Sequence, residues 1–72
     1  MRFVLVQLPA PNGGRENHAL PPGEIDAAQA LCDLPRPGRW ALNGFTVRLL
    51  SIDCMTCRIR AAALLPHAPA RA

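Results

Sequence analysis

The chain has 72 residues, a formal net charge of +3 and a hydrophobic content of 50%. A chain of this size forms at most one domain and buries only about 60% of its unfolded surface, so a disulfide framework, a bound metal or a partner usually adds the missing stability. Many of the hydrophobic residues are alanine, and the aromatic residues are Phe3, Trp40 and Phe45. The mild positive charge permits contact with nucleic acid or an acidic protein surface but requires neither.

The three cysteines are an odd number, which argues against a closed disulfide framework. The apolar run at residues 3–6 is too short for a secretory signal, and no stretch approaches the ~18 apolar residues of a membrane span. We therefore expect a cytoplasmic protein, and in a reducing cytoplasm a group of cysteines more often binds metal than forms disulfides. All basic residues are arginine, a composition typical of high-GC coding in bacteria or their phages.

The N-terminal part predicts a strand over residues 1–8, which are nearly continuously apolar and are followed by Pro9 and Pro11. Asn-Gly-Gly at residues 12–14 indicates a turn or loop, and it could equally close a hairpin in which residues 17–20 return beside the first strand. Residues 24–31 have a short helical pattern, which a proline-rich segment ends.

The C-terminal part predicts a hairpin and a helix. Asn43-Gly44 lies between two strand-like arms within residues 40–52 and suits a type I′ turn. Asp53 is a good N-cap for a helix over residues 54–65, which contain strong helix formers. One face of this helix is apolar, with Met55, Ile59, Ala62 and Ala63. Pro66 ends the helix, so we expect one domain over residues 1–66 and a flexible tail over 67–72.

Cys54-x-x-Cys57 falls at the start of the predicted helix, where two thiolates three residues apart can reach one metal ion. Free backbone N–H groups in this first turn favour their negative charge. Zinc prefers four tetrahedral sulfur and nitrogen ligands, and Cys32, in a turn before the hairpin, is the expected third. The order of turn, hairpin and helix predicts an α+β fold: a small, zinc-stabilised, treble-clef-like domain with an N-terminal strand.

The fourth ligand is a choice between His18 and His67. A helix over residues 54–65 places its end about 18 Å from the metal, and His67 follows too closely to fold back. His18 has a flexible connection toward Cys32 and is therefore favoured, with Asp33, Asp53 or water as alternatives. Because Glu16 and Glu24 read as isolated loop carboxylates, no general base stands near the site, and we expect a structural zinc ion and no enzymatic activity.

These motifs resemble those of a loose class of short actinobacterial and phage-encoded zinc-finger-like proteins, most of them without an assigned function. The shared pattern is a histidine, a cysteine and a Cys-x-x-Cys pair before a basic helix, here His18, Ala30-Leu31-Cys32-Asp33 and Asp53-Cys54-Met55-Thr56-Cys57-Arg58-Ile59. The resemblance covers residues 18 to about 65. It departs at Asp33, where the class usually has glycine, and in its longer gap before Cys-x-x-Cys. It implies zinc binding and a phage origin.

The remaining candidates are on the surface, and they comprise Arg36, Arg39, Trp40, Arg48, Arg58 and Arg60. Trp40 is either a partner-binding residue or the largest core residue. We expect a small regulator that binds a host protein complex, such as RNA polymerase or a defence complex, with no membrane or small-molecule partner. The alternative is a nucleic-acid-binding zinc module that uses the basic hairpin and helix, and steep weakening of binding with salt would identify it.

Overall fold

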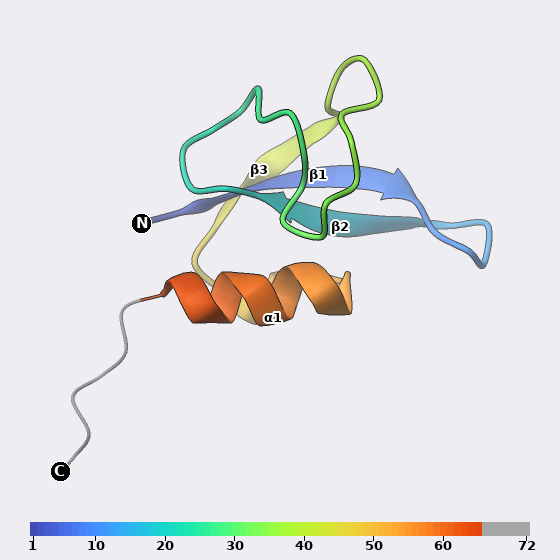
Figure 1. The fold of residues 1–72 in the computed structure, drawn as a ribbon. Helices are drawn as coiled ribbons and strands as arrows, with labels where there is room; N and C mark the ends of the chain where they lie inside the picture. Colours follow the sequence, from blue (N-terminus) through green and yellow to red (C-terminus); the bar gives the residue numbers. More distant parts are fainter. Residues whose placement is uncertain (66–72) are drawn as a thin grey trace, which may run out of the picture.

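The computed structural model describes residues 1–65, which form an α+β fold of three antiparallel strands and one long helix (Figure 1). The strands are β1 (Phe3–Pro9), β2 (Arg15–Leu20) and β3 (Leu42–Thr46), in the spatial order β2-β1-β3. A short 3-10 helix, η1 (Leu49–Ser51), and the helix α1 (Met55–Leu64) follow. The predicted α+β class is confirmed, whereas the tail predicted over 67–72 and the predicted stop at Pro66 lie outside the described residues.

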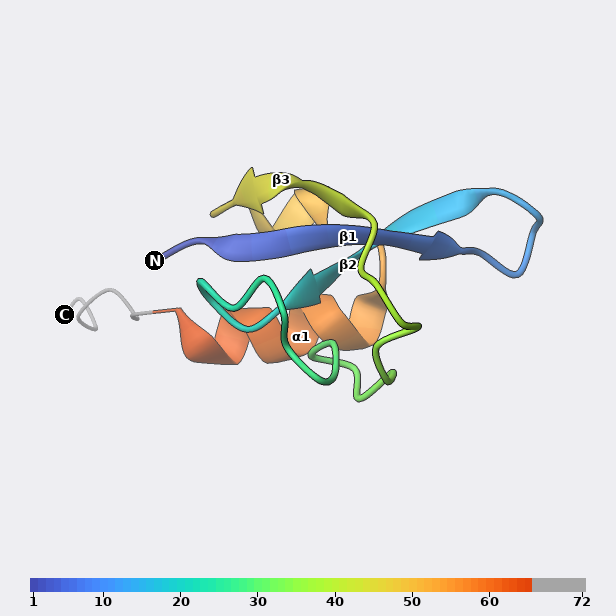
Figure 2. The ribbon, with the colours of Figure 1, turned by 90° about the horizontal axis from the view of Figure 1, so that it is seen from above.

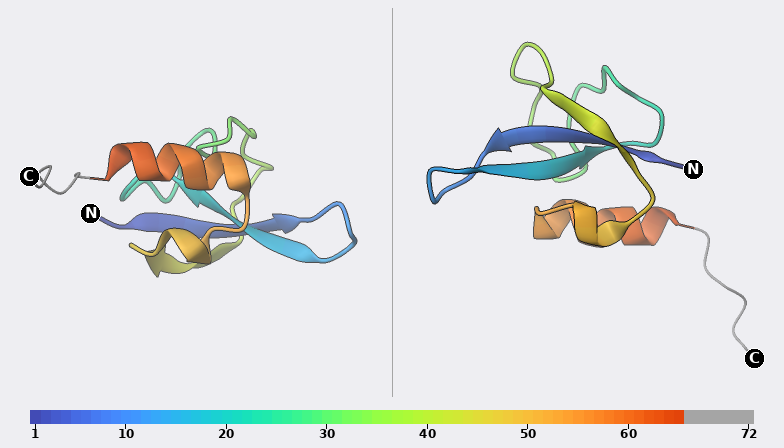
Figure 3. Two further views of the ribbon diagram at one scale, coloured as in Figure 1. Left: turned by 90° about the horizontal axis from the view of Figure 1, so that it is seen from below. Right: turned by 180° about the vertical axis from the view of Figure 1, so that it is seen from behind.

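β1 is the central strand, which explains its continuous hydrophobicity. It pairs with β2 on one edge and with β3 on the other. Residues 3–6 are all buried, so both faces of this strand are covered and no polar alternation is possible. α1 and η1 lie on one side of the sheet, as Figures 2 and 3 show.

β1 and β2 form a hairpin, which is one of the two structures that Asn-Gly-Gly at residues 12–14 predicted; the other was a loop without a returning strand. Pro9 pairs with Arg15, two residues earlier than the expected return at residue 17. The turn is closed by a hydrogen bond from the Ala10 N–H to the Gly14 carbonyl, at 2.8 Å. The Asn12 side chain accepts the Gly14 N–H at 3.0 Å. These hydrogen bonds link the two ends of the turn to each other.

The hairpin predicted over residues 40–52 is wrong. Asn43 and Gly44 lie inside β3, where the register with β1 shifts between Val4 and Val6. One residue of β1, Leu5, lies opposite two of β3, Asn43 and Gly44, and Gly44 has a φ of +89°, as expected for a glycine β-bulge. A type I′ turn and this bulge both need positive φ, so Asn-Gly alone does not distinguish them. Within the expected second arm of that hairpin, residues 49–51 instead form η1.

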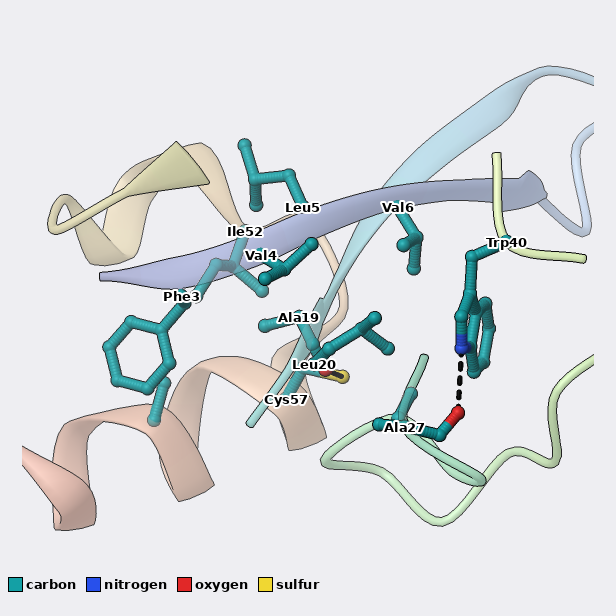
Figure 4. Packing of buried hydrophobic residues seen from close by; sticks show 12 residues of the cluster. Phe3, Val4, Leu5, Val6, Ala19, Leu20, Ala27, Trp40, Ile52 and Cys57 are labelled. Atoms are coloured by element: carbon teal, nitrogen blue, oxygen red, sulfur yellow. Dashed lines mark hydrogen bonds between the residues drawn. The ribbon is translucent and has the colours of Figure 1, made fainter. Parts of the chain in front are cut away.

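The helix predicted over residues 24–31 is also wrong, because this segment consists of turns. Its backbone groups bond to distant partners: the Leu31 N–H donates to the Ala19 carbonyl of β2, at 2.8 Å. The connection also brings Trp40 into the core, where its Nε1–H donates to the Ala27 carbonyl at 2.7 Å (Figure 4). Ala27 bonds to the indole and Leu31 bonds to β2, so residues 27–31 run along the core and do not form a helix.

α1 confirms the predicted C-terminal helix to within one residue at each end. The cap is different, because Cys54 occupies the N-cap position and Asp53 makes no capping bond. The buried face is also unexpected. Cys57 and Ala61 face the core, whereas Met55 is exposed. The helix therefore turns Cys57 and Ala61 to the core rather than its largest apolar side chains.

Candidate metal centre

The start of α1 is tied to β2 beside His18. The Asn17 carbonyl accepts the N–H groups of Asp53 and Cys54, at 2.8 and 3.2 Å. In return, the Asp53 carboxylate accepts the Asn17 N–H at 2.7 Å. This reciprocal bonding explains why Asp53 does not cap α1. It also fixes Cys54 and Cys57 next to the β2 residue that follows Asn17.

Cys32 lies in the tight turn at residues 30–33, which we call the knuckle. The Asp33 N–H donates to the Ala30 carbonyl at 2.9 Å, and Asp33 has a φ of +71°. From α1, the Arg60 guanidinium donates to the Leu31 carbonyl and to the Asp33 carboxylate, both at 2.7 Å. The knuckle is therefore held between β2 and α1, with Cys32 directed toward both.

The structure brings four predicted ligands together: His18, Cys32, Cys54 and Cys57. Their ligand atoms all lie within 4.8 Å of one another, and the three cysteines are free thiols. The His18 Nδ1 is 3.5 Å from the Cys32 Sγ and 3.7 Å from the Cys57 Sγ. Tetrahedral zinc with ordinary bond lengths places such N and S atoms about 3.6 Å apart. The donor atoms can thus hold one metal ion after only small side-chain movements.

The orientation of His18 is set by Glu16, two residues earlier on the same face of β2. The Glu16 carboxylate lies 2.9 Å from the His18 Nε2. With Nε2–H donating to Glu16, the Nδ1 lone pair faces the sulfur atoms, which is the tautomer that metal binding needs. The expectation that Glu16 is an isolated loop carboxylate is wrong. The signal was present in the sequence, because residues at i and i+2 of a strand share a face.

Burial keeps the innermost thiol neutral in the metal-free site. Cys57 is fully buried, and this burial raises the pKa of its thiol to about 12. Its Sγ lies 3.8 Å from the Ala19 carbonyl, and the sulfur atoms of Cys32 and Cys54 also oppose its ionisation. A cation among the four side chains would reverse this preference, since a coordinated thiol loses its proton.

The alternative ligands have other partners. The Asp33 carboxylate binds Arg60, and the Asp53 carboxylate binds the Asn17 backbone, so neither belongs to the four-residue cluster. His67 lies outside the described residues. The choice of His18 over the alternatives therefore agrees with the geometry of the described part of the chain.

The predicted surface residues fall into three groups. Arg36, Arg58 and Arg60 each donate a hydrogen bond to a backbone carbonyl of the domain. Trp40 is only 5% exposed, so the structure makes it a core residue rather than a contact for a partner. Arg39 and Arg48 are exposed. Some of the basic residues thus stabilise the domain through hydrogen bonds to its own backbone.

Comparison with known proteins found no matching family model, no similar curated protein and no similar solved structure. The resemblance to short zinc-finger-like proteins stays a prediction. Among residues 1–65, no helix is long and apolar enough to cross a membrane.

Proposed function

We propose that this chain is a non-enzymatic zinc-binding domain in which the ion holds together a surface for a partner protein. The observation that carries the proposal is the convergence of one imidazole nitrogen and three sulfur atoms within 4.8 Å. Three thiolates and one imidazole are an established donor set of structural zinc sites. Soft sulfur ligands also select zinc over the hard cations magnesium and calcium.

The arrangement favours a structural role. Four protein donors complete a tetrahedron, whereas a catalytic zinc ion keeps one position for water or substrate. His18 is 3% exposed and Cys57 is fully buried, so access to the ion is restricted. The ligands come from three segments far apart in the sequence, which are β2, the knuckle and the start of α1. A metal ion there links segments that a small core holds weakly.

We describe the fold as treble-clef-like in its metal-binding parts. The knuckle and the N-terminal turn of α1 provide three ligands, in the order that the sequence predicted. The intervening hairpin is replaced by β3, which pairs with β1. His18 supplies the fourth ligand from β2.

A protein partner is favoured over nucleic acid. Three of the five arginines first considered for a basic surface bond to backbone carbonyls of the domain, which reduces their freedom to follow a phosphate chain. The surface also exposes several large apolar side chains, a feature of protein-binding faces. The salt dependence of binding remains the test, because phosphate contacts weaken steeply as salt rises.

The zinc proposal is tested by measuring the metal content of the purified full chain by mass spectrometry. We expect one zinc ion per chain, and substitution by cobalt should give the visible absorption bands of a tetrahedral thiolate site. His18→Ala should lower the zinc affinity, whereas the matched histidine control His67→Ala should not. Protein that is folded and free of metal, or equal losses in the two histidine variants, would contradict the proposal.

A further inference from the structure

α1 turns its large apolar residues toward solvent. Met55 and Ile59 are 58% and 63% exposed, and they lie at positions i and i+4 on one face, followed by exposed Ala63. The opposite face, with Cys57 and Ala61, packs against the domain. A surface helix normally buries its widest apolar stripe. In α1, ligand placement decides the orientation, and the stripe of larger side chains is left without a partner within residues 1–65.

η1 extends this apolar surface. It packs against α1 on the same side of the sheet (Figures 1 and 3). Its residue Leu50 is 77% exposed, the highest value among the exposed large hydrophobic residues, whereas neighbouring Leu49 packs against the core. We call the exposed apolar side chains of η1 and of the Met55–Ile59 face of α1 the α1–η1 patch; it comprises Leu50, Met55, Ile59 and Ala63. Grouped exposed hydrophobic residues of this kind mark interaction sites more often than scattered ones.

Most of the charged side chains around the patch are positive. α1 contains no carboxylate and carries Arg58 and Arg60, and Arg48 precedes η1. Asp53 is the only carboxylate in residues 36–65, and it already accepts the Asn17 N–H. Within the described chain, Arg60 pairs with Asp33, while Arg48 and Arg58 form no ion pair. The apolar patch is therefore bordered mainly by positive charge, from Arg48 and Arg58, which have no carboxylate partner among residues 1–65.

This charge pattern discriminates between occupants. In a two-fold dimer through this patch, the bordering arginines of the two copies would approach one another, which costs free energy. Nucleic acid would complement the arginines but would leave the Met55 and Ile59 side chains against phosphate and sugar. A protein segment with an apolar stripe and acidic borders satisfies both parts of the surface.

We propose that the α1–η1 patch binds an amphipathic helix of a partner protein whose apolar stripe is bordered by Asp and Glu residues. The inference rests on the proposed function, since it names the partner chemistry of the surface that the zinc ion holds. Met55 to Ala63 covers about two helical turns, or roughly 12 Å. A partner helix with apolar residues at i, i+4 and i+7 matches this length. The acidic borders add specificity and a faster association rate.

The test uses two synthetic helical peptides with the same leucine stripe, bordered by Glu in one and by Lys in the other. Binding to the full, zinc-loaded chain is followed by fluorescence anisotropy. We expect the Glu-bordered peptide to bind at least about tenfold more tightly than the Lys-bordered peptide. Ile59→Ser should weaken its binding by about tenfold, as for a central interface residue. The control Leu42→Ser, at a 54% exposed residue of β3, should leave binding unchanged.

Three results would overturn this inference: no binding of the Glu-bordered peptide, equal binding of both peptides, or equal loss in the Ile59 and Leu42 variants. A dimer in sedimentation equilibrium that Ile59→Ser converts to a monomer would show that a second copy occupies the patch instead. Zinc content is measured on the same samples. One zinc ion per chain without peptide selectivity rejects the patch alone, whereas folded, zinc-free protein rejects the proposed function.

Discussion

The Nε2 of His18 and the Oε1 of Glu16 lie 2.9 Å apart on one face of β2. This contact selects the imidazole tautomer whose Nδ1 faces the three sulfur atoms. His18 is almost completely buried, so Glu16 is also the partner that satisfies its second ring nitrogen. Glu16 therefore belongs to the candidate metal centre although it is not one of the four candidate ligands.

Glu16→Ala should lower zinc affinity by about 10- to 100-fold, the usual effect of losing the group that orients a histidine ligand. Glu16→Gln should lose less, because its amide oxygen still accepts the Nε2–H. Competition with a chromophoric chelator measures both affinities. Glu24→Gln serves as the control, since Glu24 is exposed and lies outside the ligand cluster. Equal affinity of the Glu16→Ala variant and the unsubstituted chain would exclude this orienting role.

Removal of the ion should unfold the domain. Structural zinc contributes roughly 10–16 kcal/mol in zinc-finger peptides, which exceeds the whole stability of most small domains. We expect a strong chelator to abolish the cooperative thermal transition, and zinc to restore it. Cys57→Ser should do the same without chelator, because the fully buried Cys57 is the innermost ligand. Circular dichroism follows both experiments, and a chelated protein that melts at an unchanged temperature would contradict this expectation.

Much of the metal centre could be predicted from the sequence, because ligand type and spacing are local properties. Cys54-x-x-Cys57 needs only one helical turn to bring two sulfur atoms together. His18 was selected by reach along the chain, and the structure places it in the cluster. The class of the fold followed in the same way, from a continuous apolar strand and a helix of strong helix formers.

The errors arose where distant partners determine local structure. Asn43-Gly44 has the same requirement for positive φ in a turn and in a bulge, and only the pairing of β3 with β1 decides between them. Asp53 is a good capping residue, but its carboxylate accepts a hydrogen bond from the Asn17 N–H instead of from the first turn of α1. The orientation of α1 could not be predicted from the sequence either, since helical periodicity places Met55 and Ile59 on one face without showing whether that face contacts the core.

Asp33 occupies a backbone position that also suits glycine, the residue that the predicted resemblance expects there. Its φ of +71° lies in the left-handed region, which glycine adopts freely and aspartate tolerates. Asp33→Gly removes the exposed ion pair with Arg60, which solvent screens, but also removes the backbone strain, so stability should change little. Asp33→Ala loses the pair and keeps the strain, and should be less stable than Asp33→Gly by about 1 kcal/mol. Thermal unfolding of the zinc-loaded variants measures the difference, and equal stability of the two would contradict it.

Zinc affinity should fall as the pH falls. In the metal-free site, burial raises the pKa of Cys57 to about 12, so this thiol is protonated at neutral pH and must lose its proton when the ion binds. Because the loaded state holds fewer protons, a higher pH favours it, and each protonated thiol contributes about a tenfold change in affinity per pH unit. Titration calorimetry in buffers of different ionisation enthalpy counts the protons released. We expect at least one proton at pH 7, and an affinity that is independent of pH between 6 and 8 would contradict thiolate coordination by Cys57.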